Sequence, residues 1–76
     1  MPRELSPDVV LRIHPTAHAL SVYDGATRLG LVIADDNWRT ARSWAFDAEG
    51  RPLGEFRRRR EAMAAVGAAV RGGGAP

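Results

Sequence analysis

The residues best suited to chemistry in this sequence are four consecutive arginines, called the arginine cluster below: Arg57, Arg58, Arg59 and Arg60. The cluster follows the strand-like residues 50–56 and precedes an alanine-rich helical segment. Guanidinium groups bind phosphate bidentately, yet a helix N-terminus carries about half a positive charge and favours acidic side chains. Glu55 and Glu61 can offset part of the repulsion, and a bound polyanion would offset more. The cluster is therefore the first candidate for phosphate binding.

The distribution of charge points to the same part of the chain. The net charge is only +2, but residues 1–36 hold three Arg against five acids, whereas residues 37–60 hold seven Arg against three. Every cation is Arg, which contacts phosphate and guanine bidentately better than Lys does. A chain rich in Ala, Arg and Gly also fits a GC-rich coding sequence, so composition alone leaves both explanations open.

Apolar patterning predicts the elements that position these arginines. We expect strands over residues 9–13, 17–23, 27–34, 38–46 and 51–56, with a hairpin turn at Asp24-Gly25 and another turn over 47–50. In the return strand, Leu29, Leu31 and Ile33 share one face.

Residues 57–70 are good helix formers with apolar side chains at helical spacing, and they form the one helix predicted. Gly67 and the alanines would let this helix lie close to small residues of the sheet. The fold class is α+β: an antiparallel sheet of three to four strands with one C-terminal helix packed on one face. A single domain covers residues 9–71, between a flexible N-terminal tail over 1–8 and a disordered tail over 72–76.

The third long strand allows two registers. In the first, Ala41, Ser43 and Ala45 face the helix, and Trp44 and Phe46 lie exposed on the opposite side together with Arg42. In the second, the large aromatic side chains form the core, since each buries about 150 to 250 Å².

The residues Leu53-Gly54-Glu55-Phe56, followed after four residues by Glu61-Ala62 and then by Ala65-Val66, resemble a known sheet-to-helix junction. This junction is found in the plant ethylene-response-factor type of DNA-binding domain. The pattern also resembles the arm-binding domain of phage tyrosine integrases, and Trp38-Arg39-Thr40-Ala41-Arg42 is similar to the tryptophan-led strand of both families. The resemblance covers roughly residues 20–70 and implies a sheet that enters the DNA major groove.

Carried over to this sequence, the resemblance implies that Arg42 and Trp44 face DNA, with Arg39 and Arg51 beside them. It assigns four residues to the core: Ala41, Phe56, Ala62 and Val66. Read physically, Arg42 could contact guanine and Trp44 could stack on a sugar or a base if they face outward. The arginine cluster would contact phosphates, with at most two of its four side chains facing one groove.

Other classes of site have little support in the sequence. His14 and His18 are four residues apart, but Pro15 lies between them and no third ligand is evident, so we expect no metal. We expect no cofactor and no enzymatic activity in a chain of 76 residues without a glycine-rich phosphate loop. The chain has no cysteine and no apolar run of the roughly 20 residues that a membrane span needs, which favours a cytoplasmic protein.

The sequence therefore predicts a small DNA-binding module that contacts phosphates through the arginine cluster and bases through the sheet. The alternative is a phage- or plasmid-encoded inhibitor, of the anti-CRISPR kind, that docks on a host nucleic-acid-handling protein complex. Arg and Trp suit both, since they are enriched in protein hot spots. A homodimer formed through the helix or a sheet edge is a third reading, because a core this small gains stability from a partner.

Overall fold

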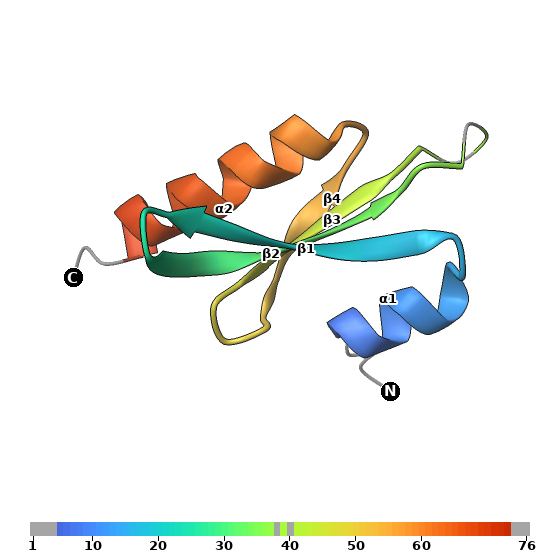
Figure 1. The fold of residues 1–76 in the computed structure, drawn as a ribbon, viewed down its shortest axis with the longest axis horizontal. Helices are drawn as coiled ribbons and strands as arrows, with labels where there is room; N and C mark the ends of the chain where they lie inside the picture. Colours follow the sequence, from blue (N-terminus) through green and yellow to red (C-terminus); the bar gives the residue numbers. More distant parts are fainter. Residues whose placement is uncertain (1–4, 38, 40, 74–76) are drawn as a thin grey trace.

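The computed structural model describes residues 5–37, 39 and 41–73, which form a four-stranded antiparallel sheet and two helices. The elements in chain order are α1 (Pro7–Ile13), β1 (Ala17–Asp24), β2 (Thr27–Asp35), β3 (Ser43–Asp47), β4 (Pro52–Phe56) and α2 (Arg59–Gly73). The strands lie in the order β1-β2-β3-β4, and the two helices lie on opposite sides of the sheet (Figure 1). The predicted α+β class with a C-terminal helix packed on the sheet is confirmed.

The first element differs from the prediction, because residues 9–13 form the last part of helix α1 instead of a strand. The Val9 N–H donates to Ser6 Oγ at 3.3 Å, so Ser6 caps the helix, and Pro7 occupies its first turn. Serine at the cap and proline just inside the helix are typical start signals, and they outweigh the β-branched residues that follow. Pro7 and Asp8, expected in the flexible tail, thus belong to α1, while residues 1–4 of that tail lie outside the described residues.

The predicted hairpin joins β1 to β2. Gly25 takes a φ of +63°, as the turn requires, and Asp24 pairs with Thr27, so the turn residues are Gly25 and Ala26. A register shift next to Val22 changes which side chains of β2 point to each face of the sheet. Leu29 packs in the core beneath α2 instead of sharing a face with Leu31 and Ile33, because the bulge inserts one extra residue.

The third strand is shorter than the predicted 38–46 and begins at Ser43. Before it, the Ala41 N–H donates to the Asn37 carbonyl oxygen at 2.7 Å, and Ala41 adopts a φ of 38°, which no strand residue has. Residues 36, 37, 39, 41 and 42 therefore lie in a loop, and Trp38 and Thr40 of the predicted strand lie outside the described residues. Ala41 is exposed, so its assignment to the core is wrong.

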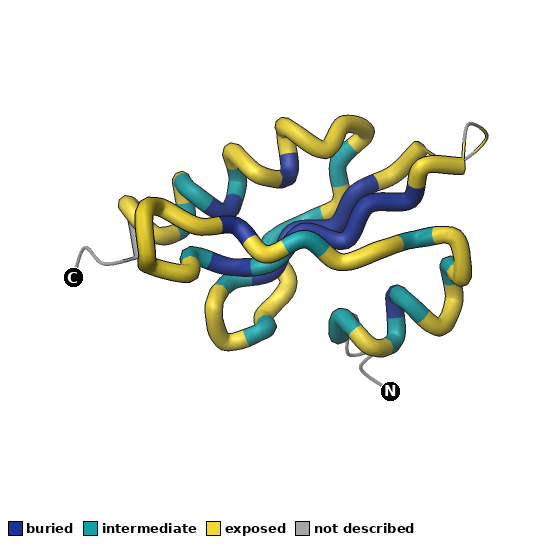
Figure 2. The backbone as a smooth tube through the Cα atoms, in the orientation of Figure 1, coloured by how far each residue is buried: buried dark blue, intermediate teal, exposed yellow. Residues whose placement is uncertain are grey.

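Two separate cores lie on the two faces of the sheet. Figure 2 shows buried residues along the strands that lie between the two helices. The core beneath α2 contains Val22, Val32, Ala45, Ala62 and Val66, and Phe56 packs against it. The core beneath α1 contains Val10, Ile33, Trp44 and Phe46. The predicted core positions Phe56, Ala62 and Val66 are confirmed.

Each of the two registers predicted for β3 is correct in part. Ala45 faces α2, and Trp44 and Phe46 point to the opposite side, as in the first register. That side is nevertheless covered by α1, so Trp44 is only 5% exposed and Phe46 is fully buried. The exposed aromatic face of the first register is therefore wrong, and the buried aromatic side chains of the second register are correct for Trp44 and Phe46.

Close packing of α2 depends on Gly30 of β2. A Cβ at Gly30 would lie 2.4 Å from the Phe46 carbonyl oxygen and 2.8 Å from Val66 Cγ1, so the helix could not approach as it does. Gly67 was expected to have this role, but a Cβ there would meet only an arginine side chain at 3.6 Å, an ordinary contact. Helix α2 starts at Arg59, two residues later than predicted, and extends through Gly72 and Gly73 of the expected tail; residues 74–76 lie outside the described residues.

Candidate nucleic-acid interface

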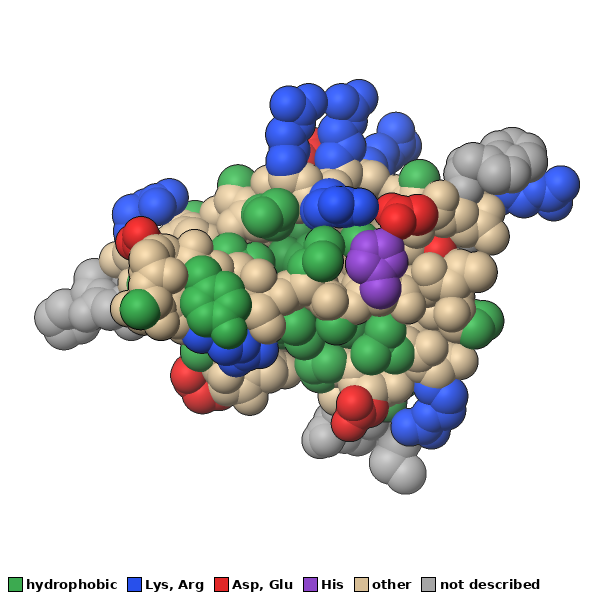
Figure 3. Space-filling model, in the orientation of Figure 1, with side chains coloured by type: hydrophobic (Ala, Val, Ile, Leu, Met, Phe, Trp, Pro, Cys, Tyr) green, Lys and Arg blue, Asp and Glu red, His purple; other side chains and the backbone are tan. Residues whose placement is uncertain are grey.

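The arginine cluster spans the junction between β4 and α2. Arg57 and Arg58 lie in the bend after β4, and Arg59 and Arg60 begin the helix, with all four side chains exposed. Basic side chains gather over the start of α2 in the space-filling view (Figure 3). Only half of the cluster is helical, which reduces the conflict with the helix dipole.

Two carboxylates offset the remaining repulsion. Glu61, in the first turn of α2, accepts a hydrogen bond from the Arg58 backbone N–H at 3.3 Å and so caps the helix start. Arg59 Nη2 lies 3.2 Å from Oδ1 of Asp36, a residue of the loop after β2. Glu61 has the compensating role expected of it, whereas Asp36 was not anticipated, since 23 residues separate it from Arg59.

The remaining three cluster residues are called the open arginines: Arg57, Arg58 and Arg60. Within residues 5–37, 39 and 41–73, their side chains form no ion pair with a carboxylate. Charged side chains of this kind remain available for a ligand, because no intramolecular bond must be broken first.

A shallow open groove of about 730 Å³ lies beside the open arginines. Its lining residues come from the loop before β3, from β4 and from the junction: Ala41, Arg42, Glu55, Phe56, Arg57 and Arg58. Arg42 Nη1 forms an ion pair with Glu55 Oε2 in this groove. The structure thus places Arg42 next to Arg57 and Arg58, as the predicted site requires, but gives its guanidinium a carboxylate partner.

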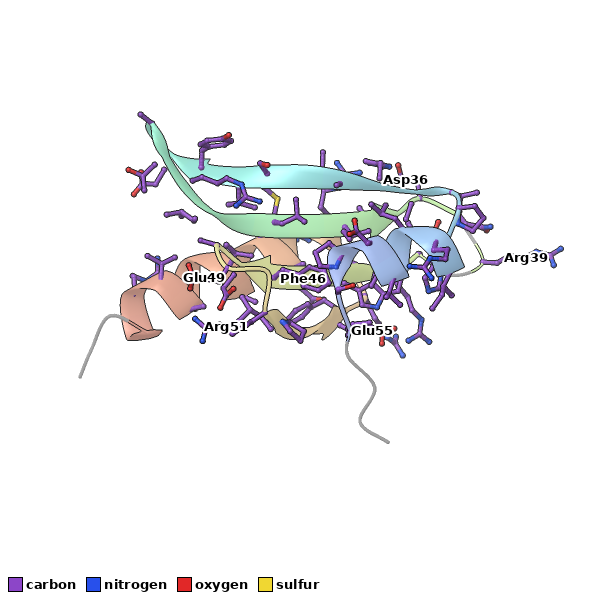
Figure 4. All side chains as sticks on the ribbon, turned by 90° about the horizontal axis from the view of Figure 1, so that it is seen from below. Asp36, Arg39, Phe46, Glu49, Arg51 and Glu55 are labelled. Carbon is purple, nitrogen blue, oxygen red and sulfur yellow. The ribbon has the colours of Figure 1, made fainter. Side chains whose placement is uncertain are left out.

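Arg51 lies at the opposite end of β3 and β4, in their connecting turn, and is held by two acids. Its Nε lies 3.0 Å from Asp47 Oδ2 and its Nη2 lies 2.8 Å from Glu49 Oε1. The side chains of Glu49 and Arg51 point toward one another in Figure 4, far from Glu55. Arg51 therefore does not flank the other predicted site residues.

The same ion pairs shift the pKa values of Asp47 and Arg51. Partial burial raises the pKa of Asp47, but hydrogen bonds from the Arg51 and Glu49 N–H groups and the Arg51 charge outweigh burial and leave the pKa below its ordinary value. Hydrogen bonding to Glu49 and the charge of Asp47 raise the pKa of Arg51. The charge of Arg51 is thus paired with the carboxylates of Asp47 and Glu49 within the turn.

The other two predicted site residues have different surroundings. Arg39 lies in the loop before β3, where its backbone N–H donates to Asn37 Oδ1 at 3.0 Å, and its side chain extends outward from the loop in Figure 4. Trp44 lies beneath α1, with its ring centroid 4.5 Å from that of His14. The prediction that Trp44 faces DNA is wrong, because helix α1 covers the face of the sheet that would have entered the groove.

The two histidines contact different carboxylates. His14 Nδ1 lies 3.7 Å from Asp35 Oδ2, and His18 Nε2 lies 3.6 Å from Asp36 Oδ2. The buried Asp35 also accepts a hydrogen bond from Thr16 Oγ1 at 2.6 Å. In the part of the chain that the structure describes, no three metal-ligating side chains come together.

Comparisons with protein-family models, with curated proteins and with solved structures found no match for this chain. Neither described helix combines the length and the apolar character needed to cross a membrane. The chemistry of the site therefore rests on its own residues: an exposed group of guanidinium donors beside a shallow groove.

Proposed function

We propose that the protein binds the phosphate backbone of duplex DNA through the open arginines. The observation that carries the proposal is the presence of three exposed guanidinium groups at one junction that form no ion pair with a described carboxylate. Groups of this kind form bidentate, charge-assisted hydrogen bonds with phosphate oxygens.

Binding in this way is independent of sequence. Trp44 is buried and Arg42 is paired with Glu55, so the two residues considered for base contacts are both occupied. Phosphate contacts position a protein on the duplex without reading bases, and each contact adds a salt-sensitive increment to affinity. The groove-inserting sheet implied by the family resemblance is not part of the proposal, because α1 covers that face.

The magnitude of the effect follows from counterion release. Neutralising one phosphate lowers the slope of log affinity against log salt by about 0.9, so three contacts give a slope of about −2.7. Raising the salt from 50 to 200 mM should then weaken binding about 40-fold. This is a weak, steeply salt-dependent association.

The test is a fluorescence-anisotropy titration of a labelled duplex of random sequence, measured over a range of salt concentrations. The variant Arg57→Gln/Arg58→Gln/Arg60→Gln should lose most of the affinity and of the salt slope. The matched control, Arg12→Gln/Arg28→Gln/Arg71→Gln, removes three exposed charges elsewhere and should change the slope by less than about 1. Equal losses in the two variants would overturn the proposal, as would a wild-type protein that binds no duplex at 50 mM salt.

A second candidate function is docking on an acidic protein surface of a host complex, by an inhibitor encoded on a phage or plasmid. It is favoured by the intramolecular pairing of Arg42, Arg51 and Arg59, which leaves a compact cationic patch in place of a long basic face. A compact patch suits a protein surface, where a few arginines dominate the binding energy. Tighter binding to poly-L-glutamate than to a duplex of equal charge would favour this candidate and count against DNA.

A further inference from the structure

The outer edge of β1 is open. Strand β1 pairs with β2 along one side over all eight of its residues, and no segment within the described ranges pairs with its other side. Figure 4 shows β1 along the upper border of the sheet, with both helices lying over the faces of the sheet and not beyond this edge. Its backbone N–H and C=O groups on that side are thus available to another strand.

The opposite edge of the sheet is protected in ways that β1 is not. Strand β4 has five residues, Pro52 lacks an N–H donor, and Gly54 takes a φ of +149° beside a register shift. Short length, proline, irregular register and charge are the devices that keep edge strands apart. Strand β1 has eight residues, and from Ala17 to Tyr23 it contains no Asp, Glu, Lys, Arg, Pro or Gly.

The side chains of β1 are complementary to those of a second antiparallel β1. An alignment centred on Ser21 places Leu20 opposite Val22 of the second copy, on the face that carries α2. It also places His18 opposite Asp24, and Ala19 opposite Tyr23, a residue that is 58% exposed in the single chain. Opposite pairs that are apolar or aromatic stabilise antiparallel strands, and a histidine ring can donate a hydrogen bond to a carboxylate. Figure 3 shows apolar side chains across the side of the molecule that β1 fronts.

We propose that β1 pairs antiparallel with β1 of a second copy, so that two chains form a homodimer with a continuous eight-stranded sheet. The two-fold axis of such a pair is perpendicular to the sheet, so both α2 helices lie on one face. In this register residues 18–24 of the edge pair with the same residues of the second copy, and the side chains match on both faces of the sheet. The dimer does not depend on DNA binding; where both hold, it presents two sets of open arginines on one face.

The first measurement is the mass of the full chain in solution by sedimentation, without nucleic acid. A dimer gives twice the 8.2 kDa of one chain, with a proportion that rises with concentration. Ser21→Lys places two like charges directly opposite one another and should weaken dimerisation about tenfold or more, while circular dichroism shows that the chain remains folded. The control Ala64→Lys adds the same charge at an exposed position of α2 and should leave the dimer unchanged.

The register has a test of its own, because the chain has no cysteine. Under mild oxidation, Ser21→Cys should form an intermolecular disulfide, since directly opposite Cβ atoms lie about 4.5 to 5.5 Å apart. Glu55→Cys, on the β4 edge, leaves the β1 pairing intact but should form no intermolecular disulfide. The proposal is overturned by a monomeric mass at all concentrations, by equal cross-linking of the two variants, by a dimer that persists in Ser21→Lys, or by a different protein pairing with β1 in place of the second copy.

Discussion

Arg51 and the open arginines lie at opposite ends of β3 and β4 and differ in their surroundings. Asp47 and Glu49 hold Arg51 within its own turn, at 3.0 and 2.8 Å, whereas the open arginines have no carboxylate partner among the described residues. The residue type is the same at both ends, so residue type alone does not make a binding site. Intramolecular pairing determines which guanidinium groups remain available for a ligand.

The largest effect is expected from a substitution that displaces α2, because this helix holds the arginine cluster at its end of the sheet. Gly30→Ala places a Cβ against the Phe46 carbonyl and Val66, and it should lower the free energy of unfolding by about 1–3 kcal/mol. Chemical denaturation measures this loss. The loss of duplex affinity should accompany it, because the start of α2 moves with the helix.

Gly67→Ala is the control for this change. Its Cβ meets only an arginine side chain at 3.6 Å, and alanine favours the helix, so the variant should gain up to about 1 kcal/mol of stability. If Gly30→Ala is as stable as the wild type, the close approach of α2 to β2 is refuted.

A smaller effect is expected from a substitution that removes the carboxylate partner of Arg59. Asp36→Asn removes the carboxylate that lies 3.2 Å from the Arg59 guanidinium and leaves one more uncompensated positive charge beside the cluster. Duplex affinity should rise about two- to threefold at low salt, as expected for one partly screened exposed charge. Asp24→Asn removes an equal charge at the β1–β2 turn and should leave affinity unchanged; an equal gain in both variants would mean that only net charge matters.

The smallest expected effect concerns the Asp47 turn and its dependence on pH. The folded pKa of Asp47 lies below its ordinary value of 3.8, so its ionised form is stabilised by folding. This contribution is complete above the unfolded pKa and is lost as the pH falls through the folded pKa.

Asp47→Asn should therefore be less stable than the wild type at neutral pH, and the difference should close below about pH 4. Thermal unfolding of both proteins from pH 7 to pH 2.5 measures it. A difference that stays constant down to pH 2.5 would show that the charge of Asp47 has no part in holding Arg51. Duplex binding above pH 5 should be equal in the two proteins.

The sequence predicted those parts of the fold that depend on local signals. Asp24-Gly25 predicted the hairpin because few residues tolerate a positive φ, and the alanine-rich run predicted α2. The same kind of signal existed for α1 in Ser6-Pro7-Asp8, and the strand prediction for residues 9–13 gave too much weight to two valines. Seven residues are too few for periodicity to distinguish a helix from a strand.

The candidate site was less predictable, because its composition depends on contacts between distant residues. The cluster itself is evident from four consecutive arginines, but Asp36 reaches Arg59 only through the packing of α2 on the sheet. The burial of Trp44 depends on α1, so the error in α1 became an error in the site. The pairing of Arg51 with Asp47 and Glu49 was within reach of the sequence, since an Asp that opens a turn hydrogen-bonds the backbone that follows it, and Arg51 lies in that turn.

The most direct test of the account is an NMR titration that follows the arginine side-chain Nε–Hε signals while a short DNA duplex is added at low salt. We expect the signals of Arg57, Arg58 and Arg60 to shift together and the Arg51 signal to stay in place. A shift of Arg51 as large as that of the open arginines would refute selective binding by the open arginines, as would signals that do not move at duplex concentrations that saturate the anisotropy change.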